Sequence, residues 1–324
     1  MTLTKASSLA ALLLCSLLGF AAFAQAPEKP ATEAVSPPAA QGSAYTEKGA
    51  DTCLGCHDAS WRVPILPIFK TKHGQRADKR TPFAPGGLQC EACHGPGAAH
   101  AASGDESLII NFERHSSHSA AEQNRPCLEC HKGNARAQWG GSTHERNDVA
   151  CASCHKIHVQ RDPALRKATQ PDVCFTCHLK QRADFNKPTT HPVRVGKVGC
   201  SDCHSVHGSP AKAMLAKPTV NQTCYTCHAE KRGPFLWEHA PVAEDCTSCH
   251  TPHGSVYPAL LTKSPPLLCQ QCHAASGHPS VPYTSSALPG GTAVPSGFLL
   301  AGSCTNCHSQ VHGSNHPSGA KLMR

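Results

Sequence analysis

The sequence predicts short α-helices joined by coil, with negligible β-structure, in an elongated row of repeats. Three observations predict it. The 324 residues are only 39% hydrophobic and 5% aromatic and include 25 glycines and 27 prolines. A chain of this length therefore has few large apolar side chains with which to form a core. One motif, Cys-x-x-Cys-His, recurs ten times. Its copies start 22 to 26 residues apart in the middle of the chain and 35 to 37 at the ends, so each repeat has room for one or two helical turns and contacts mainly its neighbours.

The first 24 residues have the pattern of a secretory signal peptide. Lys5 precedes an apolar run over residues 9–23, and a small-x-small triplet at residues 22–24 predicts cleavage before Gln25. An uncleaved anchor is the alternative, but the run is shorter than the ~20 apolar residues that a spanning helix needs. Cys15 lies inside the segment and would leave with it. We therefore expect an exported, periplasmic protein.

Two segments outside the repeats have the composition of connecting chain. Residues 25–48 are rich in Ala, Pro, Glu and Ser without apolar periodicity, which predicts an extended tether, serving either as a plain spacer or as a docking segment. Residues 279–302 are rich in Pro, Gly and Ser and predict a surface loop.

The ten motifs use every cysteine of the expected mature chain. Two residues between the thiols let each sulfur reach one vinyl group of the same porphyrin, and the next residue places an imidazole under the iron. Zinc sites pair two Cys-x-x-Cys knuckles without needing a fixed adjacent His, so ten motifs that all end in His disfavour zinc. The sequence therefore predicts ten covalently bound haem c groups, on Cys53, Cys56, Cys90, Cys93, Cys127, Cys130, Cys151, Cys154, Cys174, Cys177, Cys200, Cys203, Cys224, Cys227, Cys246, Cys249, Cys269, Cys272, Cys304 and Cys307.

The histidines suffice for two axial ligands at each iron. Beyond the signal peptide the only methionines are Met214 and Met323, so His/Met ligation cannot be general. The motifs supply ten proximal ligands: His57, His94, His131, His155, His178, His204, His228, His250, His273 and His308. Taken two at a time, the motifs have one His between them and another after the second, which gives ten distal candidates: His73, His100, His144, His158, His191, His207, His239, His253, His278 and His312.

The spacing of the distal candidates restricts which iron each can bind. His158, His207 and His253 follow their own motif histidine by three residues, too few for the chain to pass around a porphyrin. They must bind another haem, most simply the partner in the pair, although ligation across pair boundaries is also open. The remaining histidines, His115, His118 and His316, are expected at the surface, with His316 a possible replacement for His312.

The formal charge of +8 needs correction for the cofactors. Each haem brings two propionates, which together outnumber the excess of Lys and Arg. The excess of Lys and Arg over Asp and Glu is therefore no argument for nucleic acid as a partner.

Several runs between and within the motifs are more specific than the motif itself. They are Gly-Leu-Gln-Cys-Glu-Ala-Cys-His at 87–94, Cys-His-Ala-Glu-Lys-Arg-Gly-Pro at 227–234, Leu-Trp-Glu-His-Ala-Pro-Val at 236–242, Cys-Gln-Gln-Cys-His at 269–273 and His-Ser-Gln-Val-His-Gly-Ser-Asn-His-Pro-Ser-Gly at 308–319. With these runs, residues 49–324 resemble the MtrA/DmsE/PioA group of periplasmic decahaem cytochromes. The resemblance implies two pentahaem halves, 49–178 and 179–324. It also implies insertion into an outer-membrane β-barrel of the MtrB kind, with periplasmic electron carriers and an extracellular MtrC-like decahaem cytochrome as partners.

Two classes of function compete. A wire has only six-coordinate irons and conducts electrons between partners, whereas a reductase of small oxyanions needs an iron with an open site. All ten motifs end in His and ten distal candidates are available, which favours the wire and no catalytic residues. The wire could serve extracellular metal-oxide respiration, extracellular dimethyl sulfoxide reduction or ferrous iron oxidation.

Overall fold

The computed structural model describes residues 44–113, 116–273 and 304–323, all within one compact unit, Gln41–Arg324. The predicted signal peptide, the predicted tether as far as residue 43, and the predicted loop over residues 279–302 lie outside the described residues.

Short helices make up the regular structure. The longest α-helix in the described ranges, α4, has 11 residues and begins with a capping box between Ser119 and Glu122. The α-helices are α1 (Ala50–Leu54), α2 (Glu91–His94), α3 (Ala98–Ser103), α4 (Ala120–Cys130), α5 (Thr143–Arg146), α6 (Cys151–Cys154), α7 (Gln170–Cys174), α8 (Leu179–Asp184), α9 (Cys200–Cys203), α10 (Val220–Cys224), α11 (Ala240–Glu244) and α12 (Pro265–Cys269). The 3₁₀ turns are η1 (Leu66–Lys70), η2 (Glu106–Leu108), η3 (Asn134–Arg136), η4 (Pro163–Leu165), η5 (Lys212–Met214), η6 (Ala229–Lys231), η7 (Cys246–Ser248), η8 (Pro258–Leu260), η9 (Cys304–Asn306) and η10 (Gly319–Lys321).

The predicted fold class, short helices and coil with negligible β-structure, is confirmed. Pairing between extended segments in the described part of the chain is limited to isolated bridges: Thr189 with Ser255, His204 with Leu215, Trp237 with Ser314, and His250 with Leu261. Over the same residues, no helix has both the length and the apolar character needed to cross a membrane.

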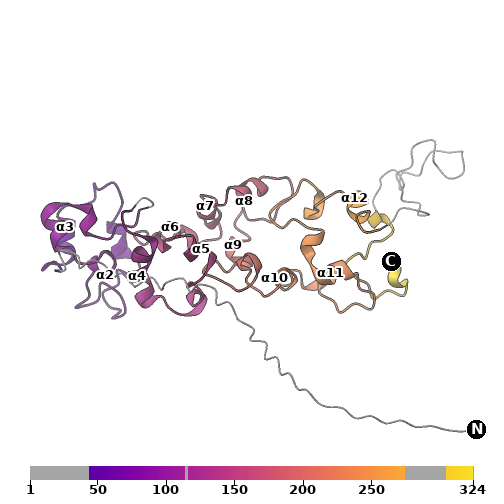
Figure 1. Ribbon diagram of the computed structural model, residues 1–324, viewed down its shortest axis with the longest axis horizontal. Helices are drawn as coiled ribbons and strands as arrows, with labels where there is room; N and C mark the ends of the chain where they lie inside the picture. Colours follow the sequence, from indigo (N-terminus) through magenta and orange to yellow (C-terminus); the bar gives the residue numbers. More distant parts are fainter. Residues whose placement is uncertain (1–43, 114–115, 274–303, 324) are drawn as a thin grey trace, which may run out of the picture. The chain divides into compact units, whose positions relative to one another are not determined.

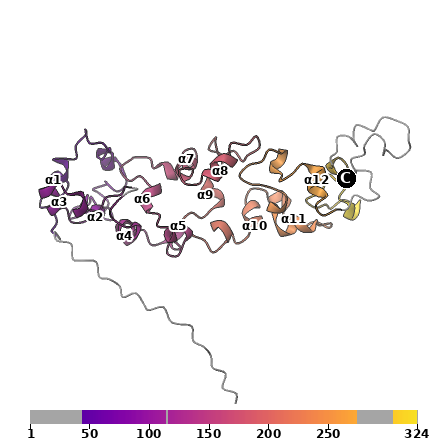
Figure 2. The same ribbon diagram turned by 45° about the horizontal axis from the view of Figure 1, so that its top comes forward.

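Within this unit the helices follow one another along its long axis, from α2 and α3 at one end to α12 at the other (Figure 1, Figure 2). Helices that carry neighbouring motifs are in contact: α2 with α4, α4 with α6, α7 with α9, α10 with η7, and α12 with η9. These five pairs of consecutive motifs are therefore adjacent in space as well as in the sequence.

Side chains alone do not form a dense core. The buried hydrophobic residues of the described ranges are Ala50, Phe83, Ala84, Ile110, Trp139, Ala150, Phe185 and Val193, and none of the large side chains there is fully buried. Since folded domains of this size normally bury most of their large apolar side chains, another group must fill the interior.

Backbone segments from different repeats meet at the His-Gly steps. Gly208 has φ +121°, and a Cβ atom built there would lie 2.0 Å from the carbonyl oxygen of Gln138. Gly254 has φ +158°, and its added Cβ would lie 2.0 Å from the carbonyl oxygen of Asp184. The glycines permit a close approach of backbone to backbone across more than sixty residues of sequence. Each His-Gly loop thus docks on an earlier repeat.

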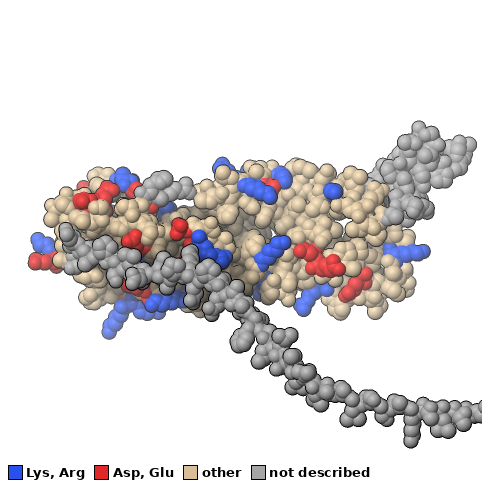
Figure 3. All heavy atoms as spheres, viewed as in Figure 1, with Lys and Arg blue, Asp and Glu red and all other residues tan. Residues whose placement is uncertain are grey.

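Charged side chains are scattered over the face seen in Figure 3, most of which carries neither sign. The described residues visible on that face form no continuous basic patch.

Candidate functional site

Each motif forms one helical turn that gathers its functional side chains. In all ten, the backbone N–H of the histidine donates to the backbone carbonyl oxygen of the first cysteine, at 2.9 to 3.1 Å. This i to i+4 bond is that of an α-helix, so residues i, i+3 and i+4 share one face. Both thiols and the imidazole of a motif are thereby presented together, as attachment to a single porphyrin requires.

The first cysteines of consecutive motifs lie against one another. A hydrogen bond between the Cys53 and Cys90 thiols lowers the pKa of Cys53 to about 7 and raises that of Cys90. The same contact between Cys200 and Cys174 lowers the pKa of Cys200 to about 7. Two porphyrins attached at such a pair would lie close to one another.

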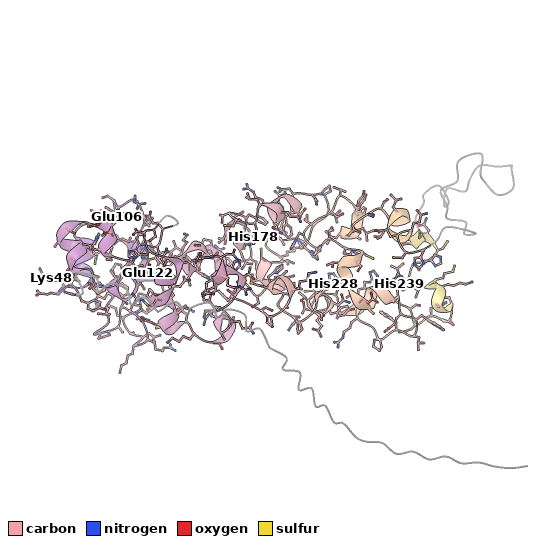
Figure 4. All side chains as sticks on the ribbon, in the orientation of Figure 1. Lys48, Glu106, Glu122, His178, His228 and His239 are labelled. Carbon is pink, nitrogen blue, oxygen red and sulfur yellow. The ribbon has the colours of Figure 1, made fainter. Side chains whose placement is uncertain are left out.

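The imidazole rings meet in pairs, each joining a motif histidine to a distal candidate. Nine pairs are present among the described residues, with ring centres 6.0 to 6.3 Å apart: His57 with His100, His131 with His73, His94 with His158, His178 with His144, His155 with His207, His228 with His191, His204 with His253, His273 with His239, and His250 with His312. Figure 4 shows three of these histidines, His178, His228 and His239, following one another along the unit.

The ring separation fits one metal ion between two imidazoles. Rings in direct contact would stack more closely, whereas two metal–nitrogen bonds of about 2 Å, one to each ring, place the ring centres about 6 Å apart. The observed 6.0 to 6.3 Å therefore matches bis-histidine ligation of one iron. Motif histidine His308 has its expected partner, His278, outside the described residues.

The simplest expectation, exchange of ligands within consecutive motif pairs, holds for only one of the nine ring pairs, His57 with His100. The other eight join different motif pairs. His158, which follows the fourth motif, faces His94 of the second, and His73, which lies between the first two motifs, faces His131 of the third. The His-Gly loops dock on the preceding pair rather than turning back on their own, so that His207, His253 and His312 face motif histidines of the preceding pair.

Ring orientation is set by hydrogen bonds at Nδ1. Among motif histidines, Nδ1 of His94, His204 and His250 bonds to the carbonyl oxygens of Ile110, Ala213 and Ala259 at 2.8 to 2.9 Å. Such a bond fixes the tautomer with the proton on Nδ1 and leaves Nε2 free to bind metal.

Three distal candidates bond in the same way to the next His-Gly loop. Nδ1 of His144 lies 2.9 Å from the carbonyl oxygen of Val206, the residue before His207. The same contact joins His191 to Pro252, before His253, at 2.8 Å, and His239 to Val311, before His312, at 3.0 Å. One loop therefore supplies a distal ring to one motif and orients the distal ring of another.

Burial keeps several of these rings neutral. Desolvation, and then the facing ring of His94, lowers the pKa of His158 to about 4. Desolvation first and the facing His155 second lower the pKa of His207 as well. Neutral imidazole is the form that binds metal, so the electrostatics favour ligation.

A continuous cavity of about 3540 Å³ runs along the paired rings. It is lined by the motif histidines of the third to tenth motifs and by cysteines from Cys93 to Cys304. The volume is several times the roughly 300 to 1,000 Å³ of a pocket for one ligand. Its shape and lining suit a row of porphyrins.

Two of the remaining histidines have other partners. Nε2 of His118 lies 3.0 Å from the carbonyl oxygen of Ile109, and Nδ1 of His316 accepts from the Ser318 N–H at 3.2 Å. His312, not His316, faces a motif histidine. His115 lies outside the described residues.

Sequence reasoning missed the groups that orient the rings. Most are backbone carbonyl oxygens, which leave no trace in a residue pattern. One is a side chain: Oδ2 of Asp162 lies 2.5 Å from Nδ1 of His155. Its only sequence signal, Asp before Pro163, is equally typical of a turn or a helix cap.

The chain is similar in sequence to known c-type cytochromes. The doubled CXXCH motif family matches residues 191–233 and 239–278, the NrfB-like cytochrome c-type family matches 90–170, and the cytochrome c554 and c-prime family matches 21–95. The multiheme cytochrome MtrA of Shewanella baltica is 52% identical over 280 residues, 86% of this chain and 83% of that protein. The cytochrome c-type protein NrfB of Escherichia coli is 30% identical over 147 residues, 44% of this chain and 72% of that protein. A solved undecaheme cytochrome from the S-layer of Carboxydothermus ferrireducens aligns with a TM-score of 0.14 and 18% identity, covering 53% of this chain and 32% of that one, a likeness that carries no argument.

Proposed function

Because the chain belongs to the family of the multiheme cytochrome MtrA, an electron-transfer cytochrome family with covalently bound haem c, we propose that it is a decahaem conduit across the outer membrane. In this proposal the ten motifs each hold one haem c between two histidines. Electrons pass between periplasmic carriers at one end and an extracellular decahaem, MtrC-like cytochrome at the other, in the service of extracellular metal-oxide respiration.

The observation that carries the proposal is the pairing of the rings. Nine motif histidines face a second imidazole at a distance that leaves room for an iron and nothing more. An iron held between two imidazoles has no position for nitrite or another substrate. This arrangement supports conduction over reduction of small oxyanions.

The order of the motifs supports a continuous path. Five pairs of helices that carry consecutive motifs are in contact, and the first cysteines of the first and second motifs lie against one another. Cross-pair ligation then fixes each haem to chain segments from two repeats. Rigid spacing suits electron transfer, because fixed centres need little rearrangement when the charge moves.

The membrane step rests on general physics and on the family. The ~30 Å hydrocarbon core does not accept irregular backbone with unpaired amides. A closed barrel of the MtrB kind would surround the haem row with a wall whose own backbone is fully hydrogen-bonded. The expected signal peptide would deliver the chain to the periplasm, from which it would enter such a barrel.

The test is electron transfer across a vesicle wall. Liposomes that enclose a reduced redox dye receive the cytochrome with its barrel, and a ferric acceptor is added outside. Dye oxidation is expected only with both proteins present. Equal rates without the barrel, or no rate with both proteins correctly inserted, would exclude the conduit and leave a periplasmic carrier.

A further inference from the structure

One motif histidine differs from four others in the group that its Nδ1 atom bonds to. Nδ1 of His94, His204, His250 and His308 bonds to a backbone carbonyl oxygen. Nδ1 of His155, in the fourth motif, bonds instead to the carboxylate of Asp162, with Oδ2 at 2.5 Å.

The carboxylate is fixed in this position. Its other oxygen, Oδ1, accepts from the N–H groups of Ala164 at 3.1 Å and Lys156 at 3.3 Å, so that Asp162 also caps η4. The Asp162 side chain is only 11% exposed. Because Oδ1 is occupied by the backbone, Oδ2 is directed at the ring.

A carboxylate acts on the ring more strongly than a carbonyl. A hydrogen bond to an ionised acceptor is roughly twice as strong as one to a neutral acceptor, and it raises the basicity of the ligand. A more basic imidazole donates more charge to the iron and stabilises Fe(III) relative to Fe(II). Hydrogen bonding to an axial ligand is one of the means by which proteins set haem potentials.

We propose that Asp162 holds the haem of the fourth motif, between His155 and His207, at a more negative potential than the haems whose motif histidines bond to carbonyl oxygens. The proposal rests on the proposed haem ligation. The redox step is the transfer of one electron from a neighbouring ferrous haem to this ferric iron, without gain or loss of a proton. Because its potential is more negative, this haem would be the first of its neighbourhood to be oxidised and the last to be reduced, which makes it a step in the potential along the row.

The charge of Arg136 near the same rings does not by itself explain a more negative potential of this haem. Arg136 lies close enough to His207 to lower its pKa, and a positive charge there favours Fe(II). Arg136 is unchanged in an Asp162 variant, so a comparison with the native protein isolates the carboxylate.

The chain offers a matched control in Glu230. Its Oε1 lies 3.8 Å from Nδ1 of His228, too far for a hydrogen bond, and both side chains are more than half exposed. Glu230→Gln therefore removes one carboxylate near a motif histidine without removing a hydrogen bond to the ring. Asp162→Glu keeps a carboxylate and serves as the conservative variant.

The experiment is a spectroelectrochemical titration of the full-length holoprotein, with haem content and electron paramagnetic resonance (EPR) recorded on each sample. In Asp162→Asn, about one-tenth of the haem absorbance is expected to move to more positive potential, with ten haems and low-spin iron retained. Glu230→Gln should leave the titration curve unchanged, and Asp162→Glu should restore most of the native curve. An unchanged curve in Asp162→Asn with full haem content would overturn the proposal and leave the conduit intact.

A second readout covers the case in which Asp162→Asn loses a haem. The EPR spectrum of the native protein should contain one low-spin component with the altered g-values of a strongly donating imidazole. If all ten components have ordinary bis-histidine values, the proposal is wrong. If Cys151→Ala with Cys154→Ala removes no haem, the proposed ligation itself is wrong, which is a separate result.

Discussion

Replacing His312 by Ala tests the ligand pairing that the structure specifies. The His312 ring lies 6.1 Å from that of His250 in the eighth motif, whereas the simplest sequence expectation places it at the ninth. Removing the imidazole opens one axial position on one iron of the proposed ten. About one-tenth of the iron should therefore become high-spin, because a five-coordinate ferric haem loses the strong field of its second nitrogen.

His316 provides the control, since it lies four residues further on and faces the Ser318 N–H rather than a motif ring. EPR of the oxidised protein should show a high-spin signal from one iron in His312→Ala and none in His316→Ala, and added imidazole should abolish it. The iron is assigned by deleting single attachment sites. The signal should disappear with Cys246→Ala and Cys249→Ala, and persist with Cys269→Ala and Cys272→Ala. The opposite pattern would refute the pairing, and a signal in His316→Ala would refute the choice of ligand.

Three further predictions concern stability. Chain made without haem attachment should be unfolded by circular dichroism, because side chains alone supply little core; a cooperative, protease-resistant apo form would contradict this. Acid should destabilise the protein, because His158 stays unprotonated in the fold: burial and the facing His94 lower its pKa to about 4, and a bound iron would exclude the proton altogether. The unfolded state then binds more protons, and stability falls as the pH drops from about 6.5 to about 4. A denaturation midpoint that stays constant over that range would count against it. Glu91→Ala should lower the free energy of unfolding by about 3 kcal/mol, because the buried carboxylate accepts from the N–H and hydroxyl of Thr46 and the N–H of Gly97. Glu106→Ala, at an exposed position, is the control. Equal denaturation midpoints for the two variants would argue against a stabilising role of Glu91.

The fold class and the candidate ligands could be predicted from the sequence. Which distal histidine faces which motif histidine could not. The motif determines its own geometry, because a helical turn of five residues places Cys53, Cys56 and His57 on one face without help from the rest of the chain. The distal rings depend on how repeats pack. The offset of three residues excludes a motif's own haem for His207, but it gives no preference among the neighbours.

The missing information lies in backbone contacts. His207 faces His155 because Gly208 lies against the carbonyl oxygen of Gln138, and because the carbonyl oxygen of Val206 accepts from Nδ1 of His144. Neither contact has a residue-type signature beyond the glycine. For the same reason, the role of Asp162 could not be separated from that of an ordinary capping residue.

The ring pairs also bear on the predicted division after His178, which stays a prediction. A boundary after an even-numbered motif would separate the two rings in each of two observed ring pairs. After the fourth motif, for example, these pairs are His178 with His144 and His155 with His207. A boundary after the fifth motif separates only His155 from His207. Two pentahaem halves would then be joined by one ligand bridge, and the bridged iron would be the one whose motif histidine is bonded to Asp162. A more negative potential would then belong to the one haem whose two ligands come from different halves.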